Sequence, residues 1–167
     1  ADLDVVLGLI PIDDKSKIAK ILGIAPRELA CDVVSGRIIK KLDLGKINNQ
    51  YFMYSAEIVD APVTITCNNF QISPTTERHT IQVCNFGQLI AASDPTDGKM
   101  EAIITPMRTA WMGGSKPIKS TILPFTKIDI NSAGDEPVTI LTDEQMIMKT
   151  PARIEIVPGR LKVIVGS

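Results

Sequence analysis

From Ile38 onward, apolar and polar residues alternate in short segments that end at turn residues. Alternation with a period of two is typical of strands that bury one face. Many short strands at this spacing predict a β-sandwich or a flattened barrel, and Asn48-Asn49 and Pro158-Gly159 have the composition of hairpin turns. The expected strands lie near Ile38–Ile47, Tyr51–Ile58, Val63–Cys67, Thr80–Phe86, Met100–Met107, Lys119–Asn131, Val138–Thr142, Arg153–Val157 and Leu161–Val165.

The first 36 residues have a different character, because their pattern indicates a strand followed by two helices. Their continuous apolar run suits a buried strand, often a parallel one. The expected elements are a strand over Val5–Ile12, a helix over Lys15–Leu22 capped by Asp13 or Asp14 and stopped by Gly23, and a helix over Pro26–Ser35 stopped by Gly36. We therefore divide the chain into an α/β segment, residues 1–36, and a β-rich domain, residues 37–167.

The composition excludes several classes of protein. The chain has 167 residues, of which 44% are hydrophobic and 4% aromatic, so it can bury an aliphatic core. A net charge of −1 argues against a nucleic-acid-binding protein. The sequence contains neither an apolar run of membrane-spanning length nor a signal-peptide pattern. Cys31, Cys67 and Cys84 fit neither a zinc site nor a disulfide framework, which suits a reducing compartment such as the cytoplasm.

Four segments, in sequence order, resemble motifs of one protein family. Ile10–Ile24 is similar to P-x-G-T-x-N-D-[FL]-A-R-x-L-G-I, and Leu42–Phe52 is similar to D-L-G-x-[IV]-N-G-x-Y-F. Asp94–Ile104 is similar to D-G-x-[LM]-[DE]-[VA]-[VI]-[VI], and Asp143–Val165 keeps the register of D-G-E-x-x-x-x-T-P-x-x-[IV]-x-[IV]-x-P-x-x-[LI]-x-[VI]-x-V. The family is that of diacylglycerol kinases, which includes sphingosine kinases and bacterial lipid kinases and is related in fold to NAD kinases.

This resemblance implies a fold and a reaction. Residues 37–167 would form a β-sandwich of the lipid-kinase or NAD-kinase C-terminal type, and residues 1–36 the end of an α/β nucleotide lobe. The family transfers the γ-phosphoryl group of ATP to a lipid hydroxyl with magnesium, so ATP, Mg²⁺ and a lipid at the membrane surface are the implied ligands. The family's G-G-D-G-T loop would lie upstream, in a longer protein. The N-terminal lobe is thus an expected partner, and the chain alone is expected to be inactive.

The family's second nucleotide contact, G-T-x-N-D, reads Asp13-Asp14-Lys15-Ser16-Lys17 in this sequence. On the resemblance, Asp14 and Ser16 occupy cofactor-binding positions. Glycine lets a backbone approach phosphate closely, whereas two adjacent carboxylates repel phosphate. Lys15 and Lys17 offset part of that repulsion.

The family's D-G-E triplet reads Asp143-Glu144-Gln145, so only its first position is kept. The resemblance implies that Asp143 is the base for the lipid hydroxyl, whereas the neutral amide of Gln145 cannot accept a proton. The alternative is a structural role for Asp143 at a turn or strand end. The last two strands are expected to pair as a closing hairpin at Pro158-Gly159, with the acidic turn in front of them.

The segment from Asp94 to Gly98, DPTDG, has two interpretations. On the resemblance it is a magnesium site, in which Asp97 supplies a carboxylate and the backbone carbonyls near Asp94 and Lys99 supply further oxygens. Oxygen ligands suit a hard cation. The alternative is a plain turn, which this composition also favours.

Other features depart from the family or stand outside its motifs. The helical insertions that the family carries after the strands matching Tyr51–Ile58 and Met100–Met107 are expected to be largely missing. His79, the only histidine, and Lys40-Lys41 are expected at the surface. Trp111 either folds over the end of the sandwich or forms an exposed contact surface.

Three hypotheses for the function follow. The first is a domain of a diacylglycerol-kinase-like enzyme. The second is a catalytically degenerate module that keeps the same scaffold for binding or regulation, which the altered motifs and lost insertions favour. The third is an unrelated β-sandwich interaction domain. On the first hypothesis the protein would work in the cytoplasm and at the periphery of a membrane.

Overall fold

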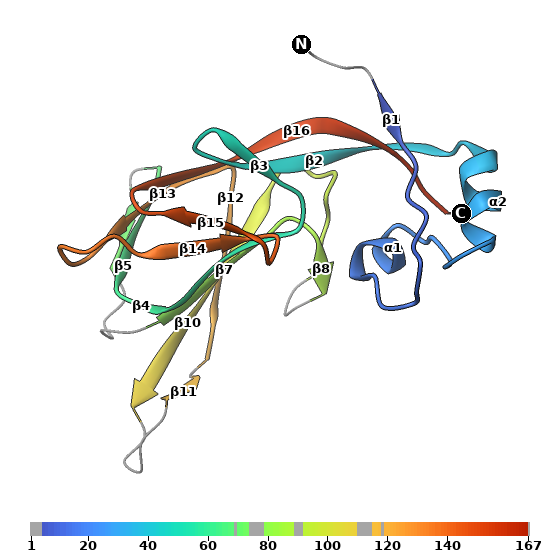
Figure 1. Cartoon of the computed structure of the whole chain (residues 1–167). Coiled ribbons are helices and arrows are strands. Elements are labelled where there is room, and N and C mark those ends of the chain that lie inside the picture. Colours follow the sequence, from blue (N-terminus) through green and yellow to red (C-terminus); the bar gives the residue numbers. More distant parts are fainter. Residues whose placement is uncertain are drawn as a thin grey trace.

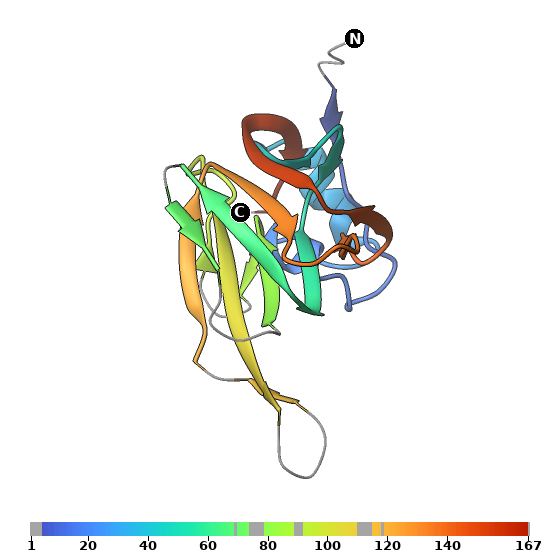
Figure 2. The ribbon, with the colours of Figure 1, turned by 90° about the vertical axis from the view of Figure 1, so that its left-hand side faces the viewer.

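A computed structural model of the protein describes residues 5–68, 70–73, 79–88, 92–109, 115–117 and 119–166. It is a sandwich of two seven-stranded sheets with two short helices at one end (Figure 1 and Figure 2). The expected fold class is therefore confirmed: the protein is mainly β and begins with a short segment that contains both helices. Neither helix in the described part of the chain is long and apolar enough to cross a membrane.

The first sheet is built around a long strand, β16. Its order is β3-β2-β16-β13-β5-β6, and β1 pairs with β16 in parallel. The other neighbours in this sheet are antiparallel. Its strands are β1 (Val6–Leu7), β2 (Ile39–Ile47), β3 (Gln50–Phe52), β5 (Val63–Cys67), β6 (Phe70–Ile72), β13 (Lys127–Ser132) and β16 (Ala152–Ile164).

The second sheet has the order β11-β10-β7-β4-β14-β15, with β12 paired to β10. The far end of β10 pairs with β11 and projects from the sandwich as an arm (Figure 1). The strands of the second sheet are β4 (Ser55–Ala61), β7 (His79–Cys84), β10 (Met100–Thr109), β11 (Ser115–Pro117), β12 (Thr121–Phe125), β14 (Thr139–Thr142) and β15 (Met146–Lys149). A separate pair consists of β8 (Gly87–Gln88) and β9 (Ala92–Ser93).

One large aliphatic core joins the two sheets. The first sheet contributes Ile47, Ile65 and Ile154, and the second contributes Ile58 and Ile81. Each of these side chains is at most 1% exposed. Burying an isoleucine contributes about 1.5–3 kcal/mol, so a chain with few aromatic residues still has a substantial core.

The two faces of the ribbon formed by β2 and β16 pack against two different hydrophobic clusters. Ile47 pairs with Ile154, and Leu42 pairs with Leu161. Residues 42 and 47 are separated by an odd number of positions in one strand, so their side chains leave opposite faces. The Ile47 pair belongs to the large core, whereas the Leu42 pair belongs to a smaller cluster beside the helices.

The smaller cluster fixes the N-terminal segment to this ribbon. The two helices are α1 (Lys17–Ile21) and α2 (Leu29–Gly36). Ala19 and Ala30, one from each helix, are buried against Leu42 and Val163. The α/β segment therefore packs directly on the β-rich part, and the boundary at residues 36 and 37 stays a prediction.

The apolar run Val5–Ile12 differs from its expected structure. Only Val6–Leu7 form a strand, and the parallel pairing is confirmed. The prediction of burial is wrong, because Val5 is 50% and Leu7 49% exposed. The described strands cover one edge of β1 only, so burial of this run is not achieved within the described part of the chain.

The expected N-cap of the first helix is also wrong. Ser16 is the cap: its Oγ accepts a hydrogen bond from the Ala19 backbone N–H at 3.2 Å. Asp13 instead accepts the Lys15 N–H at 2.9 Å, two residues along the chain. Both residue types are good caps, and only the backbone path selects serine here.

Pro158-Gly159 does not form a hairpin turn. β16 continues through it, and β2 is its neighbour both before and after. A register shift between Val157 and Leu161 marks a bulge instead. Gly159 has a φ of 58°, which glycine adopts without strain.

Several smaller predictions are resolved. The hairpin at Asn48-Asn49 is confirmed, because Ile47 pairs with Gln50. The expected strands Tyr51–Ile58 and Lys119–Asn131 each divide into two strands. Beyond residue 37, the described part of the chain contains no helix, as expected from the missing insertions.

His79 is not a surface residue, since it is 1% exposed. It begins β7, which lies between β4 and β10 in the middle of the second sheet. Lys40-Lys41 are exposed on β2, as expected. Trp111 lies outside the described residues.

Candidate functional site

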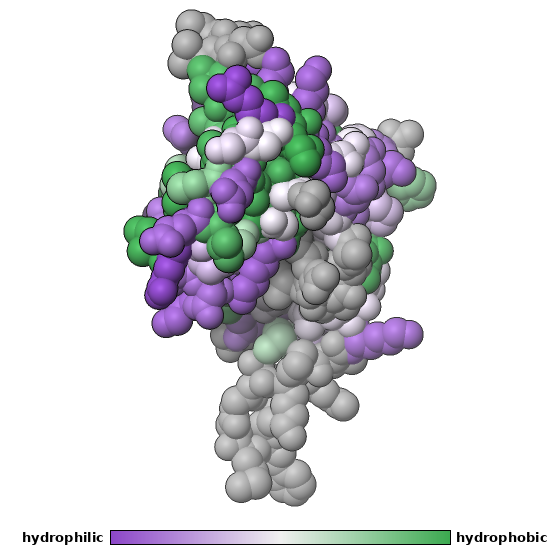
Figure 3. Space-filling view, turned by 90° about the vertical axis from the view of Figure 1, so that its right-hand side faces the viewer, coloured by the Kyte–Doolittle hydropathy of each residue, from purple (hydrophilic) through white to green (hydrophobic). Residues whose placement is uncertain are grey.

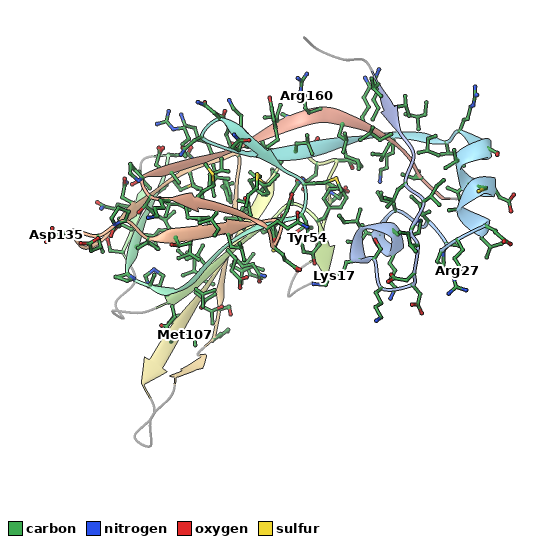
Figure 4. All side chains as sticks on the ribbon, viewed as in Figure 1. Lys17, Arg27, Tyr54, Met107, Asp135 and Arg160 are labelled. Carbon is green, nitrogen blue, oxygen red and sulfur yellow. The ribbon has the colours of Figure 1, made fainter. Side chains whose placement is uncertain are left out.

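A cleft of about 550 Å³ lies between the start of α1 and the turn that joins β14 to β15. Three short segments supply its walls: residues 15–18, residues 53–54 and residues 143–145. Lys17 and Tyr54 lie close together in this region (Figure 4). The structure thus unites two segments that match separate motifs and are more than a hundred residues apart in the sequence.

Asp143 holds one wall of the cleft through three backbone hydrogen bonds. Its carboxylate accepts the N–H groups of Met53 at 2.8 Å, Tyr54 at 2.7 Å and Ser55 at 3.0 Å. Its own N–H donates to the carbonyl of Ser55 at 2.8 Å. The backbone of Asp143 is left-handed, with a φ of 49°, in a turn that directs the carboxylate towards these groups.

Asn85 holds the same wall from the other side. It is fully buried, and its Nδ2 donates to the carbonyls of Met53 at 3.1 Å and Asp43 at 2.8 Å. The backbone N–H groups of Asn85 and Phe86 both point to the carbonyl of Tyr54. The peptide groups of Met53 and Tyr54 are therefore hydrogen-bonded on both sides, which fixes the backbone from which the Tyr54 side chain extends.

Lys17 spans the cleft. Its Nζ lies 3.1 Å from Oε1 of Glu144 and 5.6 Å from the centre of the Tyr54 ring. The hydrogen bond to Glu144 and the charge of that carboxylate raise the pKa of Lys17 above its ordinary value. Both partners remain solvent-exposed, so the ion pair is a surface contact.

The two expected nucleotide positions occupy different places. Ser16 lines the cleft, with its Oγ engaged as the α1 cap. Asp14 is exposed and lines a separate hollow beside Pro26 and Arg27. The cleft itself combines the cations of Lys15 and Lys17 with the two carboxylates described above.

Asp43 was not singled out from the sequence, yet it forms the main buried polar junction. The residue is 3% exposed, and its carboxylate accepts the N–H groups of Gly98 at 2.8 Å and Gly159 at 2.7 Å. Its N–H donates to the carbonyl of Pro95 at 2.7 Å. Asp43 thus connects β2, the DPTDG turn and the bulge of β16. The signal in the sequence that could have identified Asp43 is its place as the aspartate of the D-L-G motif.

The DPTDG turn lies away from the cleft lining and is closed by local hydrogen bonds. Asp94 Oδ1 accepts from the N–H of Thr96 at 3.0 Å and from its hydroxyl at 2.6 Å. The hydroxyl contact lowers the pKa of Asp94 below its ordinary value of 3.8. Asp97 Oδ1 accepts the Lys99 N–H at 2.8 Å.

The oxygen atoms of this turn are of the type that binds magnesium. Asp97 offers a carboxylate, and Asp94 and Lys99 offer carbonyls, which is the oxygen chemistry that a hard cation takes. Among the described residues, no three acidic, histidine or cysteine side chains are grouped so as to hold a metal ion. Asp97 Oδ1 and the carbonyl of Asp94 already accept backbone N–H groups within the turn. Magnesium at this turn therefore stays a prediction.

Apart from Asp14, which lines its own hollow, the candidate residues form two regions. Asp143 and Ser16 belong to the cleft, whereas Asp94, Asp97 and Lys99 belong to the turn. A hydrogen-bonded path joins the regions, from Gly98 through Asp43 and Asn85 to Met53 and then to Asp143.

No protein-family model matches the chain, and no curated protein sequence matches it. Solved structures do. Two structures described as diacylglycerol kinases of Bacillus anthracis strain Sterne are each 18% identical, with TM-scores of 0.71 and 0.73. A third from the same strain is 14% identical with a TM-score of 0.73. In each comparison 90% of this chain is covered, against 63%, 65% and 66% of the other chain.

The chain therefore spans just under two thirds of the length of these structures. At this level of identity the similarity concerns the fold. It confirms the resemblance noted in the sequence at the level of the fold: the protein has the fold of diacylglycerol-kinase-like proteins, consistent with the C-terminal domain of that family.

Proposed function

We propose that this chain is the β-rich domain of a diacylglycerol-kinase-like enzyme, which in its full-length form transfers the γ-phosphoryl group of ATP to a lipid hydroxyl. The cleft is the observation that carries the proposal. It places residues 15–18, which overlap the position of the nucleotide-contact motif, opposite residues 143–145, which occupy the position of the acidic triplet. Phosphoryl transfer depends on positioning a phosphate beside a base for the attacking hydroxyl.

Each residue has a role in this proposal. Asp143 lines the cleft and accepts the proton of the lipid hydroxyl. Lys15 and Lys17 attract the phosphates, and Ser16 contributes to the same wall. Asp14 lies outside the cleft lining, so its proposed part is limited to the approach of the nucleotide.

The DPTDG turn would hold magnesium through Asp97 and the carbonyls of Asp94 and Lys99. Magnesium bound there would supply positive charge that stabilises the turn. Asp43 ties this turn to the cleft wall, so the turn supports the geometry of Asp143 from a distance.

The proposed partner is the N-terminal α/β lobe of the full-length protein. An apolar surface lies at the helical end of the molecule, where apolar and polar residues are mixed (Figure 3). The N-terminal segment exposes several large apolar residues, which include Val5, Leu7, Ile10, Ile12 and Leu29. An exposed group of this kind is typical of an interface. The lipid would approach from a membrane surface, and the protein would work in the cytoplasm.

A second candidate is a non-catalytic module on the same scaffold. Three observations favour it. The carboxylate of Asp143 is already engaged by three backbone N–H groups. Gln145 is neutral where the family has glutamate. The ion pair between Lys17 and Glu144 spans the cleft.

ATP-dependent phosphorylation of a lipid panel by the full-length protein separates these two candidates. On the first, the wild type turns over at least one lipid, and Asp143→Asn lowers turnover by about 10²-fold or more, as expected for a lost base. Asp129→Asn is the matched control, because Asp129 pairs with Arg153 on the other sheet and should leave turnover unchanged. Absence of both turnover and ATP binding would leave the non-catalytic module.

A further inference from the structure

The two residues that bridge the cleft both depart from the family pattern. Lys17 stands where G-T-x-N-D has aspartate, and Glu144 stands where D-G-E has glycine. They are 127 positions apart in the sequence, yet their charged groups lie 3.1 Å apart. An aspartate and a glycine at these positions have no such ion pair to form. The two departures therefore complement each other across the cleft.

The location of this pair gives it access to any ligand in the cleft. Lys17 extends from the first turn of α1, and Glu144 from the turn between β14 and β15, so each belongs to an opposite wall. The Tyr54 ring lies beneath the ammonium group, and Asp143 and Asn85 bond the backbone of the same residue. The positive charge of Lys17 is thus held inside the cleft mouth.

The pair is also easy to open. The side chains of Lys17 and Glu144 are 63% and 68% exposed. An exposed ion pair of this kind contributes little to stability, because water and salt screen it. A phosphate, with more than one negative charge and several acceptor oxygens, is a stronger partner for an ammonium group than a single exposed carboxylate is.

We propose that Lys17 is the phosphate-contacting residue of the cleft and that Glu144 is its competitor, so that the pair sets the affinity of the cleft for phosphate compounds. The inference rests on the proposed function, since it assigns a ligand contact within the same cleft. A phosphate that enters displaces Glu144 from Lys17. Glu144 opposes binding twice, because it occupies the ammonium group and adds negative charge beside Asp143.

The chain offers a matched control. Lys46 and Glu155 form an ion pair of nearly the same length, 3.0 Å, on the first sheet and away from the cleft. Glu155→Gln removes the same charge as Glu144→Gln and changes the net charge equally. Any general effect of net charge on anion binding therefore appears in both variants.

The test is the affinity of the full-length protein for ATP and for inorganic pyrophosphate, measured by isothermal titration calorimetry without a lipid. We expect Glu144→Gln to bind both compounds roughly three- to tenfold more tightly than the wild type, because a competitor and a repulsive charge are removed. Lys17→Gln should bind both at least roughly threefold more weakly. Glu155→Gln should bind as the wild type does. Raising the salt concentration should reduce the gain of Glu144→Gln.

The outcomes separate this inference from the proposed function. If the wild type binds ATP while Glu144→Gln and Glu155→Gln change its affinity equally, the competitor role is overturned and the proposed function stands. If Lys17→Gln binds as tightly as the wild type, the phosphate contact is overturned. If no variant binds either compound, the proposed function fails together with the inference. Lys17 and Glu144 are both exposed, and thermal unfolding of each variant checks that the fold is intact.

Discussion

Asp43 and Asp143 use the same interaction in two different regions of the molecule. Each carboxylate accepts backbone N–H groups from segments far away in the sequence. Asp43 does so inside the fold, where it is 3% exposed, whereas Asp143 does so at the wall of an open cleft. The comparison shows that one interaction both closes the scaffold and shapes the cleft. The two sites differ in whether water can replace the carboxylate as the acceptor: it can do so at Asp143 in the open cleft, but poorly at the buried Asp43.

Asp43→Ala is the change with the largest expected effect. The N–H groups of Gly98 and Gly159 would lose their acceptor in a place that water reaches poorly. Hydrogen bonds to charged groups contribute about 1.5–3 kcal/mol each, so we expect a loss of about 3–5 kcal/mol in the free energy of unfolding. Urea denaturation measures it. Asp43→Asn keeps one acceptor and should lose less; equal losses in both variants would contradict this explanation.

Gly45→Ala tests the same region through packing. A Cβ at position 45 would overlap the ring of Phe52, which pairs with Gly45 across β2 and β3. We expect a loss of about 1–3 kcal/mol from overpacking. Thermal unfolding of Gly45→Ala, beside the double variant Gly45→Ala/Phe52→Leu, measures the coupling. Additive losses in the double variant would show that the ring is not the cause.

Asp143→Ala should cost less stability than Asp43→Ala, although it removes three hydrogen bonds instead of two. Water in the open cleft can partly replace the lost acceptor, so we expect about 1–3 kcal/mol. Hydrogen exchange at Met53, Tyr54 and Ser55 should become faster. A loss larger than that of Asp43→Ala would break the comparison between a buried and a cleft carboxylate.

Thr96→Val has the smallest expected effect. The Thr96 hydroxyl lowers the pKa of Asp94, so its removal should raise that pKa towards 3.8. Because the pKa of Asp94 is lower in the folded than in the unfolded protein, its carboxylate stabilises the fold at any pH above the unfolded pKa. This stabilisation is lost as the pH falls through the folded pKa. The variant should therefore lose slightly less stability on acidification. Carbon-detected NMR titration of Asp94 gives the pKa directly, and an unchanged value would contradict the role of Thr96.

The family motif around Leu42–Phe52 was predictable from the sequence, and the structure gives its physical reason. Asp43 binds two distant turns, Gly45 makes room for Phe52, and Asn48 begins the hairpin turn. These residues maintain the scaffold. Strand positions and the sandwich followed from the alternation, because a half-buried strand requires it.

Other features were not accessible from local pattern. The bulge at Pro158-Gly159 has the same composition and alternation as a hairpin, and only the pairing with β2 distinguishes them. The burial of His79 depends on the two strands beside β7. The contact between Lys17 and Glu144 required the fold, because each residue alone looked like a lost motif position.

Three departures from the family pattern line the cleft, whereas Asp43 and Gly98 of the junction keep that pattern. That contrast indicates that the junction keeps the residues of the motif while the cleft does not. Lys17, Glu144 and Gln145 are all altered, and all three line the cleft. On the proposed function, chemistry on this scaffold would therefore depend on what the altered cleft binds.

Hydrogen exchange of the full-length protein with and without ATP and magnesium tests the central claim, that the cleft between α1 and the acidic turn is the ligand site. The account predicts slower exchange in residues 15–18, 53–54 and 143–145, which line the cleft. Exchange in a hollow of similar size on the first sheet should not change; its lining includes Lys46, Asn48, Asn49, Arg153 and Glu155. Protection confined to that hollow, or absent from the cleft while ATP is bound, would contradict the account.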